Sequence, residues 1–169
     1  MTFQFLPQVP REFSGQPILI SGQKSADLQR QEFLTVEDNG NEHVFEIRFD
    51  THCSPFKEVC LLENILGVGH EEHFYLFDLE TNSNLISLKL DGYFGHVYLN
   101  DKLFYVASAG GLYCLNKEGQ IIWKNINLGI DGVVIEKFEH ELILGVGEWD
   151  PPGGWRNFKL SKSTGELIK

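Results

Sequence analysis

Short apolar runs alternate with polar turn residues along the stretch from residue 96 to residue 126. Runs rich in Val, Ile, Tyr and Phe, each broken by Gly, Asn, Asp or Lys before a helical period can develop, are typical of β-strands. The stretch therefore predicts a four-stranded antiparallel meander, with strands at 96–99, 103–107, 112–115 and 120–124.

The same pattern occurs before and after this stretch, at residues 59–90 and 133–168. The third copy also carries an insertion at 149–154, and the second runs of the three copies align at 65–69, 104–108 and 143–147. A four-strand unit that repeats at about 40 residues is the signature of β-propeller blades. The predicted fold class is all-β, with about three four-stranded antiparallel blades in a partial or distorted β-propeller and an N-terminal hairpin segment.

The whole chain, residues 1–169, is expected to form a single domain, because a chain of this length buries enough surface for one core. The pattern divides it into N-terminal strands and three blades, with boundaries at 1–58, 59–91, 92–129 and 130–169. Unpaired strand edges invite association unless they are covered. We therefore expect the N-terminal part to cover one open sheet edge.

Within that N-terminal part, residues 17–20 predict a strand. Asn39-Gly40 is a strong hairpin signal and predicts a turn between strands at 33–36 and 43–49. Residues 26–33 are interpreted as a short helical turn or an irregular loop.

The blade pattern also has a family resemblance. Residues 91–124 contain the pieces D-G, V-Y-L, D-K-L-F-Y-V-A-S, G-G-L-Y-C-L-N and G-Q-I-I-W-K in this order. They resemble a blade of the quinoprotein-like (PQQ-type) β-propeller repeat. Its l-y-x-l-d strand corresponds to residues 111–115 and its closing t-G-x-x-x-W piece to residues 119–123, with a weaker counterpart at 164–166 in the third copy. The resemblance implies an architecture but no activity, because the same blade serves enzymes and scaffolds. Quinoprotein enzymes use a full closed ring with a central cavity, so for three blades we expect no quinone and no other cofactor.

Charge narrows the choice of partner. The chain has 14 Lys and Arg against 24 Asp and Glu, which gives a formal charge of −10 and a pI of about 5.0. Phosphate backbones and anionic lipids repel such a chain, so neither nucleic acid nor a membrane is an expected partner. A basic protein would be attracted. The alternative reading is that the charge serves solubility alone.

The N-terminal residues, MTFQFLPQVPREFSG, lack the basic and apolar regions of a signal peptide, and the sequence has no apolar stretch of membrane-spanning length. The odd number of cysteines and their spacing favour reduced, buried thiols over a disulfide framework, at Cys53, Cys60 and Cys114. We therefore expect a cytoplasmic protein.

The turns predict a docking surface. In a propeller, the loops between the second and third strands and those between blades lie on one face, which here gathers 50–57, 70–73, 91–95, 108–111, 129–132 and 148–155. Aromatic side chains anchor interfaces, and carboxylates steer a basic partner. The predicted partner-binding residues are Glu71, Glu72, Asp91, Tyr93, Asp131, Glu148, Trp149, Asp150 and Trp155. The alternative reading is that the turns are simply polar and that some of these rings belong to the core.

Catalytic and metal sites are not expected. His70-Glu71-Glu72-His73 lies in a predicted turn, whereas the zinc motif HExxH needs a helix that places two His on one face. His52 and Cys53 are adjacent and would point to opposite faces of a strand, and no GxSxG or phosphate-binding loop is present. The sequence thus favours a non-catalytic protein-binding module, most concretely an acidic immunity protein that neutralises a basic secreted toxin of the nuclease type by steric occlusion. The alternatives are a propeller-type scaffold, a ligand-sensing domain or a quinoprotein-like enzyme fragment.

Overall fold

The computed structural model describes residues 1–21, 27–38, 40–53 and 55–168. Contacts divide the chain into two compact units, Met1–His52 and Cys53–Lys169. The described residues form strands and no helix, arranged in four sheets, none of which closes on itself. The predicted all-β class is therefore confirmed, and the sheets are consistent with a partial propeller-like fold.

The N-terminal unit contains one sheet of order β1-β3-β4-β2, in which β2 runs parallel to β4 and the other pairs are antiparallel. Its strands are β1 Thr2–Leu6, β2 Ile18–Leu19, β3 Arg30–Asp38 and β4 Asn41–Phe49. The predicted hairpin is present as β3–β4, and Gly40 next to the turn has a φ of 81°, which suits glycine. Asn39 lies outside the described residues.

Residues 30–33 correct the interpretation of 26–33 as a helical turn or irregular loop. They belong to β3 and pair with β4, with Arg30 opposite Phe49 and Phe33 opposite Glu46. The polar residues Arg30, Gln31 and Glu32 show no apolar pattern that would predict a strand. They are in a strand because they pair with the last residues of β4. Residue 26 is outside the described part of the chain.

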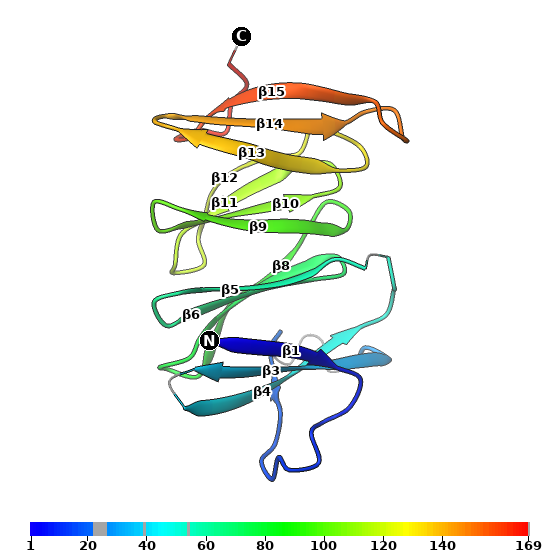
Figure 1. Cartoon of the computed structure of the whole chain (residues 1–169), viewed down its shortest axis with the longest axis vertical. Helices are drawn as coiled ribbons and strands as arrows, with labels where there is room; N and C mark the ends of the chain where they lie inside the picture. Colours follow the sequence, from blue (N-terminus) through cyan, green and yellow to red (C-terminus); the bar gives the residue numbers. More distant parts are fainter. Residues whose placement is uncertain (22–26, 39, 54, 169) are drawn as a thin grey trace. The chain divides into compact units, whose positions relative to one another are not determined.

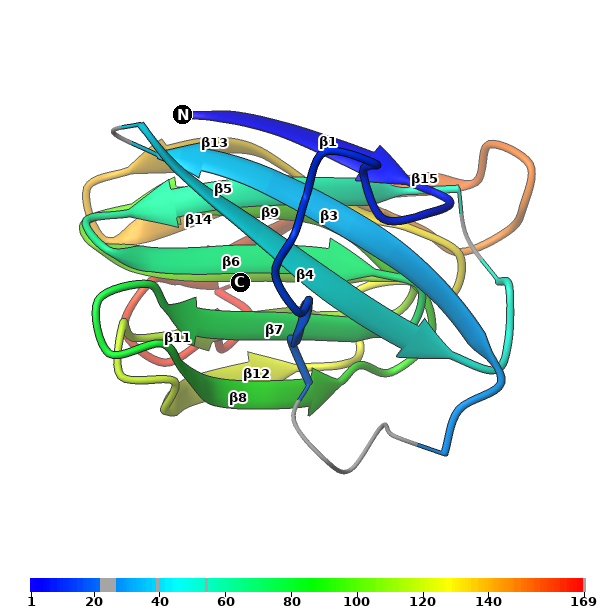
Figure 2. The ribbon, with the colours of Figure 1, turned by 90° about the horizontal axis from the view of Figure 1, so that it is seen from below.

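The C-terminal unit contains three stacked sheets (Figure 1). The first is an antiparallel meander in which the strands follow one another in chain order (Figure 2): β5 Lys57–Leu62, β6 Ile65–His70, β7 His73–Asp78 and β8 Ser83–Lys89. The second is the meander predicted from residues 96–126, formed by β9 Phe94–Asn100, β10 Leu103–Ser108, β11 Leu112–Leu115 and β12 Ile121–Asn125. The first two predicted blades are therefore present as four-stranded sheets.

Within the described residues, the third sheet has three strands instead of the predicted four: β13 Val133–Glu139, β14 Leu142–Glu148 and β15 Trp155–Ser161. In place of a fourth strand, a single bridge joins Leu160 to Leu167. The chain after β15 turns instead toward the second sheet, where Trp123 Nε1 donates to the Lys162 oxygen at 2.9 Å and Asn125 Nδ2 donates to the Gly165 oxygen at 2.8 Å. Residues 162–165 are therefore held by β12 and return to β15 only near Leu167.

The aligned runs of the three copies all lie in the second strands, β6, β10 and β14. Their glycines let neighbouring side chains approach closely. A side chain at Gly69 would overlap the Phe94 ring, and one at Gly145 would overlap Phe158. The GVG sequences are thus packing features of strands.

Two cores hold the stack together, and β10 contributes to both. Its alternating side chains point to opposite sides, with Phe104 and Val106 in the core toward the first sheet and Tyr105 and Ala107 in the core toward the third. The middle sheet is therefore covered on both faces, which explains why β10 is almost continuously apolar.

Candidate functional site

In the C-terminal unit, the turns between the second and third strands of the sheets and the linkers between sheets meet on one side, at the right in Figure 1. The linker into the second sheet is hydrogen-bonded to the β6–β7 turn through the backbone. The Phe94 amide donates to the backbone oxygen of Glu71 at 2.6 Å, and the Leu90 amide donates to the backbone oxygen of Glu72 at 2.8 Å. The same linker is bonded to the β10–β11 turn, since the Ala109 amide donates to the Tyr93 oxygen at 2.9 Å.

The linker into the third sheet continues this series of backbone hydrogen bonds. The Gly132 amide donates to the Ala109 oxygen at 2.8 Å, and the Ile130 amide donates to the Glu148 oxygen at 2.7 Å. The structure therefore brings together the predicted loops 70–73, 91–95, 108–111, 129–132 and 148–155. Below, "loop side" means these five segments. Of the sixth predicted loop, 50–57, residues 50–52 belong to the N-terminal unit and residue 54 lies outside the described residues.

The loop side exposes carboxylates and apolar groups. Asp91, Asp131 and Asp150 are exposed, and Glu72 is half-buried. Among the rings, Trp155 is 44% exposed and lies beside Gly132, whereas Trp149 and Tyr93 are half-buried. A surface that exposes three carboxylates and an indole ring can attract and then contact a basic protein.

Glu71 and Glu148 depart from the expected acidic field. Their exposed fractions are only 2% and 9%, and each carboxylate accepts a backbone hydrogen bond within the unit. Glu71 accepts from the Cys53 amide at 2.7 Å, and Glu148 accepts from the Gly153 amide at 2.6 Å. Glu71 directly follows β6, and Glu148 is the last residue of β14. The hydrogen-bonded linkers enclose both side chains at these strand ends. Their carboxylates hold loops in place and are not available to steer a partner.

Tyr93 joins two linkers. Its hydroxyl donates to the backbone oxygen of Asp131 at 2.6 Å and lies 3.1 Å from the Asp131 carboxylate. Burial, and then the hydrogen bond to Asp131, raise the pKa of Tyr93 to about 12, so the hydroxyl stays a neutral donor at physiological pH. Tyr93 therefore fixes the geometry of the loop side more than it offers contact area.

The insertion is a closed turn. Trp149 donates its amide to the Gly154 oxygen at 3.0 Å, and Gly154 donates to the Asp150 oxygen at 2.9 Å. The guanidinium carbon of Arg156 lies 5.8 Å from the centre of the Trp149 ring, within range of a cation–π interaction. These bonds present Asp150 on a turn that is already ordered, which reduces the entropic cost of binding.

A hollow of about 390 Å³ opens between the linkers. Asp91, Ile126, Ile130 and Trp149 line it together with backbone from glycines. Ile130 is 57% exposed, and neither isoleucine was among the predicted site residues. The only feature of the sequence that could have indicated Ile130 as a site residue is that it is apolar within a Gly-rich linker. An aromatic ring, two aliphatic walls and one carboxylate suit a long side chain that ends in a cation.

Of the predicted turn 70–73, only Glu71 and Glu72 form a turn, whereas His70 is the last residue of β6 and His73 the first of β7. His70 is buried, and burial lowers the pKa of His73, whose ring stacks on Tyr75 at 5.8 Å. Over the described ranges of the chain, no group of three or more His, Cys, Asp or Glu side chains is placed to hold a metal ion.

The three cysteines are free thiols, as expected, but only Cys114 is fully buried. Cys60 is partly buried and Cys53 is exposed, which corrects the expectation that all three are buried. Burial raises the pKa of Cys60 to about 12 and that of Cys114 to about 11. Burial and the neighbouring Glu71 raise the pKa of Cys53 to about 11. Because the thiolate is the reactive form, all three are weak nucleophiles near neutral pH.

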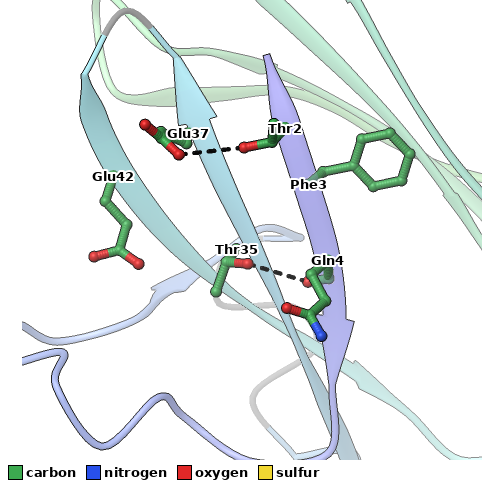
Figure 3. A pocket seen from close by; sticks show the side chains of 6 residues that line it. All are labelled: Thr2, Phe3, Gln4, Thr35, Glu37 and Glu42. Carbon is green, nitrogen blue, oxygen red and sulfur yellow. Dashed lines mark hydrogen bonds between the residues drawn. The ribbon is translucent and has the colours of Figure 1, made fainter.

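The N-terminal unit has a separate, shallow concavity of about 250 Å³ on its sheet (Figure 3). Glu37 and Glu42 face each other across the β3–β4 hairpin there. Thr2 Oγ1 donates to Glu37 at 3.3 Å, and Thr35 Oγ1 donates to the Gln4 oxygen at 3.4 Å. These residues are a solvated polar sheet face, and the six residues that line the concavity include no His, Cys or Lys to act with the carboxylates.

Comparison of the chain with protein-family models finds no match, and a search of curated proteins also finds none. The described residues include no helix that could cross a membrane. Functional inference therefore depends on the geometry and charge of the loop side.

Proposed function

We propose that the chain is a non-catalytic protein-binding module whose loop side docks a basic protein. The observation that carries this proposal is the meeting of turns and linkers from three sheets on one hydrogen-bonded side, which exposes Asp91, Asp131 and Asp150 together with Trp155. The glutamates Glu71 and Glu148 support these loops from within.

Two physical effects support such a role. A formal charge of −10 attracts a basic partner over long range and accelerates its association. Affinity at short range then comes from desolvated aromatic and aliphatic groups, for which Trp155 and Ile130 are the candidates. The loops are bonded to one another in advance, so little conformational entropy is lost when a partner binds.

The most concrete form of the proposal is an acidic immunity protein of the cytoplasm that neutralises a basic secreted toxin, of the nuclease type, by covering its active surface. Nucleic acid and membrane surfaces are disfavoured as partners by the same net charge. The resemblance to a quinoprotein-like propeller blade concerns architecture, and we propose no activity from it.

The test is calorimetry with a basic toxin domain encoded by the adjacent upstream reading frame. We expect the affinity to fall steeply with salt, and to fall about tenfold or more in Trp155→Ala, as for an interface hot spot. Glu118→Gln is the matched control, since Glu118 is exposed on the β11–β12 turn, outside the loop side. An affinity that responds neither to salt nor to Trp155→Ala would refute the proposed surface.

A scaffold or ligand-sensing domain is the second candidate, and the hollow beside Trp149 favours it. In that case a small cation would bind in the hollow, and Trp149→Leu would abolish its binding while Trp155→Ala would not. Titration with arginine methyl ester, followed by tryptophan fluorescence, distinguishes the two candidates.

A further inference from the structure

The hollow between the linkers contains three acceptor oxygens close to one point, at Gly110, which lines it. A methyl group added to Gly110 would lie 3.5 Å from Asp91 Oδ2. The same methyl group would lie 3.5 Å from the carbonyl oxygen of Gly129 and 3.7 Å from that of Ile126. One carboxylate oxygen and two carbonyl oxygens therefore converge on a space that is open because residue 110 has no side chain.

The described part of the chain leaves these oxygens without donors. The Asp91 amide donates to the Tyr113 hydroxyl at 2.8 Å, which fixes the backbone there, but no described residue donates a hydrogen bond to the Asp91 carboxylate. Among the described residues, none donates to the carbonyls of Ile126 or Gly129 either. A ligand with several N–H donors on one atom would satisfy all three oxygens together.

The charge around the hollow favours a cation. Among the described residues that line it, Asp91 alone is charged, and the five segments of the loop side contain no Lys or Arg. Arg156 follows the last of these segments, but its guanidinium carbon lies 5.8 Å from the centre of the Trp149 ring and the residue does not line the hollow. Asp131 and Asp150 add exposed negative charge on neighbouring loops, so a positively charged group is attracted.

The shape of the hollow suits the side chain of a lysine. Its volume is about 390 Å³, and its apolar walls are Ile126, Ile130 and Trp149. Ile126 is 39% exposed and Ile130 is 57% exposed, so both have apolar surface to cover. A lysine has an apolar stem and an ammonium group whose three donors point in different directions, which matches three oxygens around one point. The planar fork of an arginine fits coplanar acceptors instead.

We propose that this hollow binds the side chain of a single lysine presented by a protein. The ammonium group donates to the Asp91 carboxylate and to the carbonyls of Ile126 and Gly129. The stem lies along Ile130 and packs against Trp149. The source of the lysine is the basic protein that docks at the loop side, and in this respect the site rests on the proposed function. Such a pocket selects a partner with a protruding lysine from other basic proteins.

The probe is the end-capped peptide acetyl-Gly-Gly-Lys-Gly-Gly-amide, added to the full chain and followed by the chemical shift of the Gly110 amide. We expect saturable shifts with a dissociation constant on the order of 1 mM, and weaker binding at high salt. The same peptide with norleucine in place of lysine keeps the stem but lacks the ammonium group, and should cause no saturable shift. The arginine peptide should bind several times more weakly.

Three results of this titration would overturn the proposal. The first is that the lysine peptide causes no shift at Gly110 at about 10 mM, well above the expected dissociation constant. The second is that the norleucine peptide binds as tightly as the lysine peptide, which would identify a purely apolar hollow. The third is that the arginine peptide binds as tightly, which would overturn the match between three oxygens and an ammonium group.

Two variants and a matched control make the test specific. Gly110 does not have a positive φ, and an added methyl group makes only ordinary contacts there, so Gly110→Ala should unfold at the temperature of the parent. Its methyl group occupies the place of the ammonium group, and we expect at least tenfold weaker binding of the lysine peptide. Asp91→Asn keeps the backbone bond to Tyr113 but should weaken binding about fivefold and remove most of its salt dependence.

Gly95→Ala is the control, because it adds a methyl group to the same loop side at a residue that does not line the hollow. It should bind the lysine peptide as the parent does. Binding that is unaffected by both Gly110→Ala and Asp91→Asn, or equally affected by Gly95→Ala, would contradict the proposal.

Calorimetry with the basic toxin domain separates this site from the docking surface on which it rests. We expect Gly110→Ala to weaken binding of that domain about tenfold, as Trp155→Ala does. If binding responds to salt and to Trp155→Ala but not to Gly110→Ala, the lysine site is overturned and the docking surface stands. If binding responds neither to salt nor to Trp155→Ala while the lysine peptide still binds at Gly110, the docking surface fails and the lysine site stands.

Discussion

The hydroxyl of Tyr93 donates to the backbone oxygen of Asp131 at 2.6 Å, and so ties the linker that enters the second sheet to the linker that enters the third. The bond is local in space but spans most of one repeat in sequence. It makes the loop side one connected surface instead of a set of independent hairpin tips.

Removal of this hydroxyl is expected to loosen the loop side. Tyr93→Phe loses one hydrogen bond of a half-buried group and should lower the free energy of unfolding by about 1 kcal/mol. Urea denaturation followed by tryptophan fluorescence measures the loss, because the three tryptophans, Trp123, Trp149 and Trp155, all lie in the C-terminal unit. Asp131→Asn keeps the backbone acceptor and should cost less.

The same tyrosine predicts a pH dependence. The folded pKa of Tyr93, about 12, lies above its ordinary value of 10.0, so the folded state holds the proton more tightly than the unfolded state. The contribution of the protonated hydroxyl to the free energy of unfolding is complete below pH 10 and is lost as the pH rises toward 12. Between these values, unfolding free energy should fall less steeply in Tyr93→Phe than in the parent. If the unfolding free energies of Tyr93→Phe and the parent fell equally steeply with pH, this hydroxyl would not contribute to the pH dependence of stability.

The glycine at 165 is expected to be irreplaceable. Gly165 has a φ of 69°, and a side chain there would overlap the Trp123 ring. Gly165→Ala should therefore destabilise the C-terminal unit by about 1–3 kcal/mol beyond the backbone strain alone. Gly153→Ala is the matched control, because Gly153 has a φ of 97° but nothing within 4 Å of an added methyl group. Equal losses in urea denaturation would show that the contact with Trp123 is unimportant.

Two glycines near Phe94, Gly69 in β6 and Gly95 in β9, offer a test of core packing. Gly69→Ala places a methyl group on the buried Phe94 ring and should cost about 1–3 kcal/mol. Gly95→Ala meets the Ala107 oxygen only at 3.4 Å and should change stability by less than about 0.5 kcal/mol. Thermal unfolding of the two variants, compared with the parent, shows whether close packing against Phe94 is the reason for a glycine at position 69.

The strands could be predicted from the sequence because their signals are local. The run of apolar residues in β10 and the turns on either side of it specify a buried strand without reference to the rest of the chain. The path of residues 162–165 could not be predicted in the same way, because hydrogen bonds from the side chains of Trp123 and Asn125 hold this segment, and no local pattern encodes them.

The predicted site contained both exposed and buried carboxylates, because the sequence alone does not show which of them other parts of the chain enclose. Asp131 and Glu148 are both carboxylates next to glycine-rich turns, and nothing in the letters distinguishes them. Only the folded chain separates the exposed Asp131 from the buried Glu148, whose partner is the amide of Gly153. The side of the molecule was predictable from the repeat, whereas the role of each side chain depended on contacts between repeats.

Glu148 provides the last prediction. Glu148→Ala leaves the Gly153 amide without its acceptor, and should increase hydrogen exchange at Gly153 and lower stability by about 1–2 kcal/mol. Glu148→Gln keeps an oxygen acceptor and should restore most of the protection although the charge is gone. If Glu148 instead acted as a steering charge, both variants would slow association with a basic partner equally and leave exchange at Gly153 unchanged. Hydrogen exchange and association rates measured on the two variants therefore separate a carboxylate that holds the 149–154 turn from one that attracts a partner.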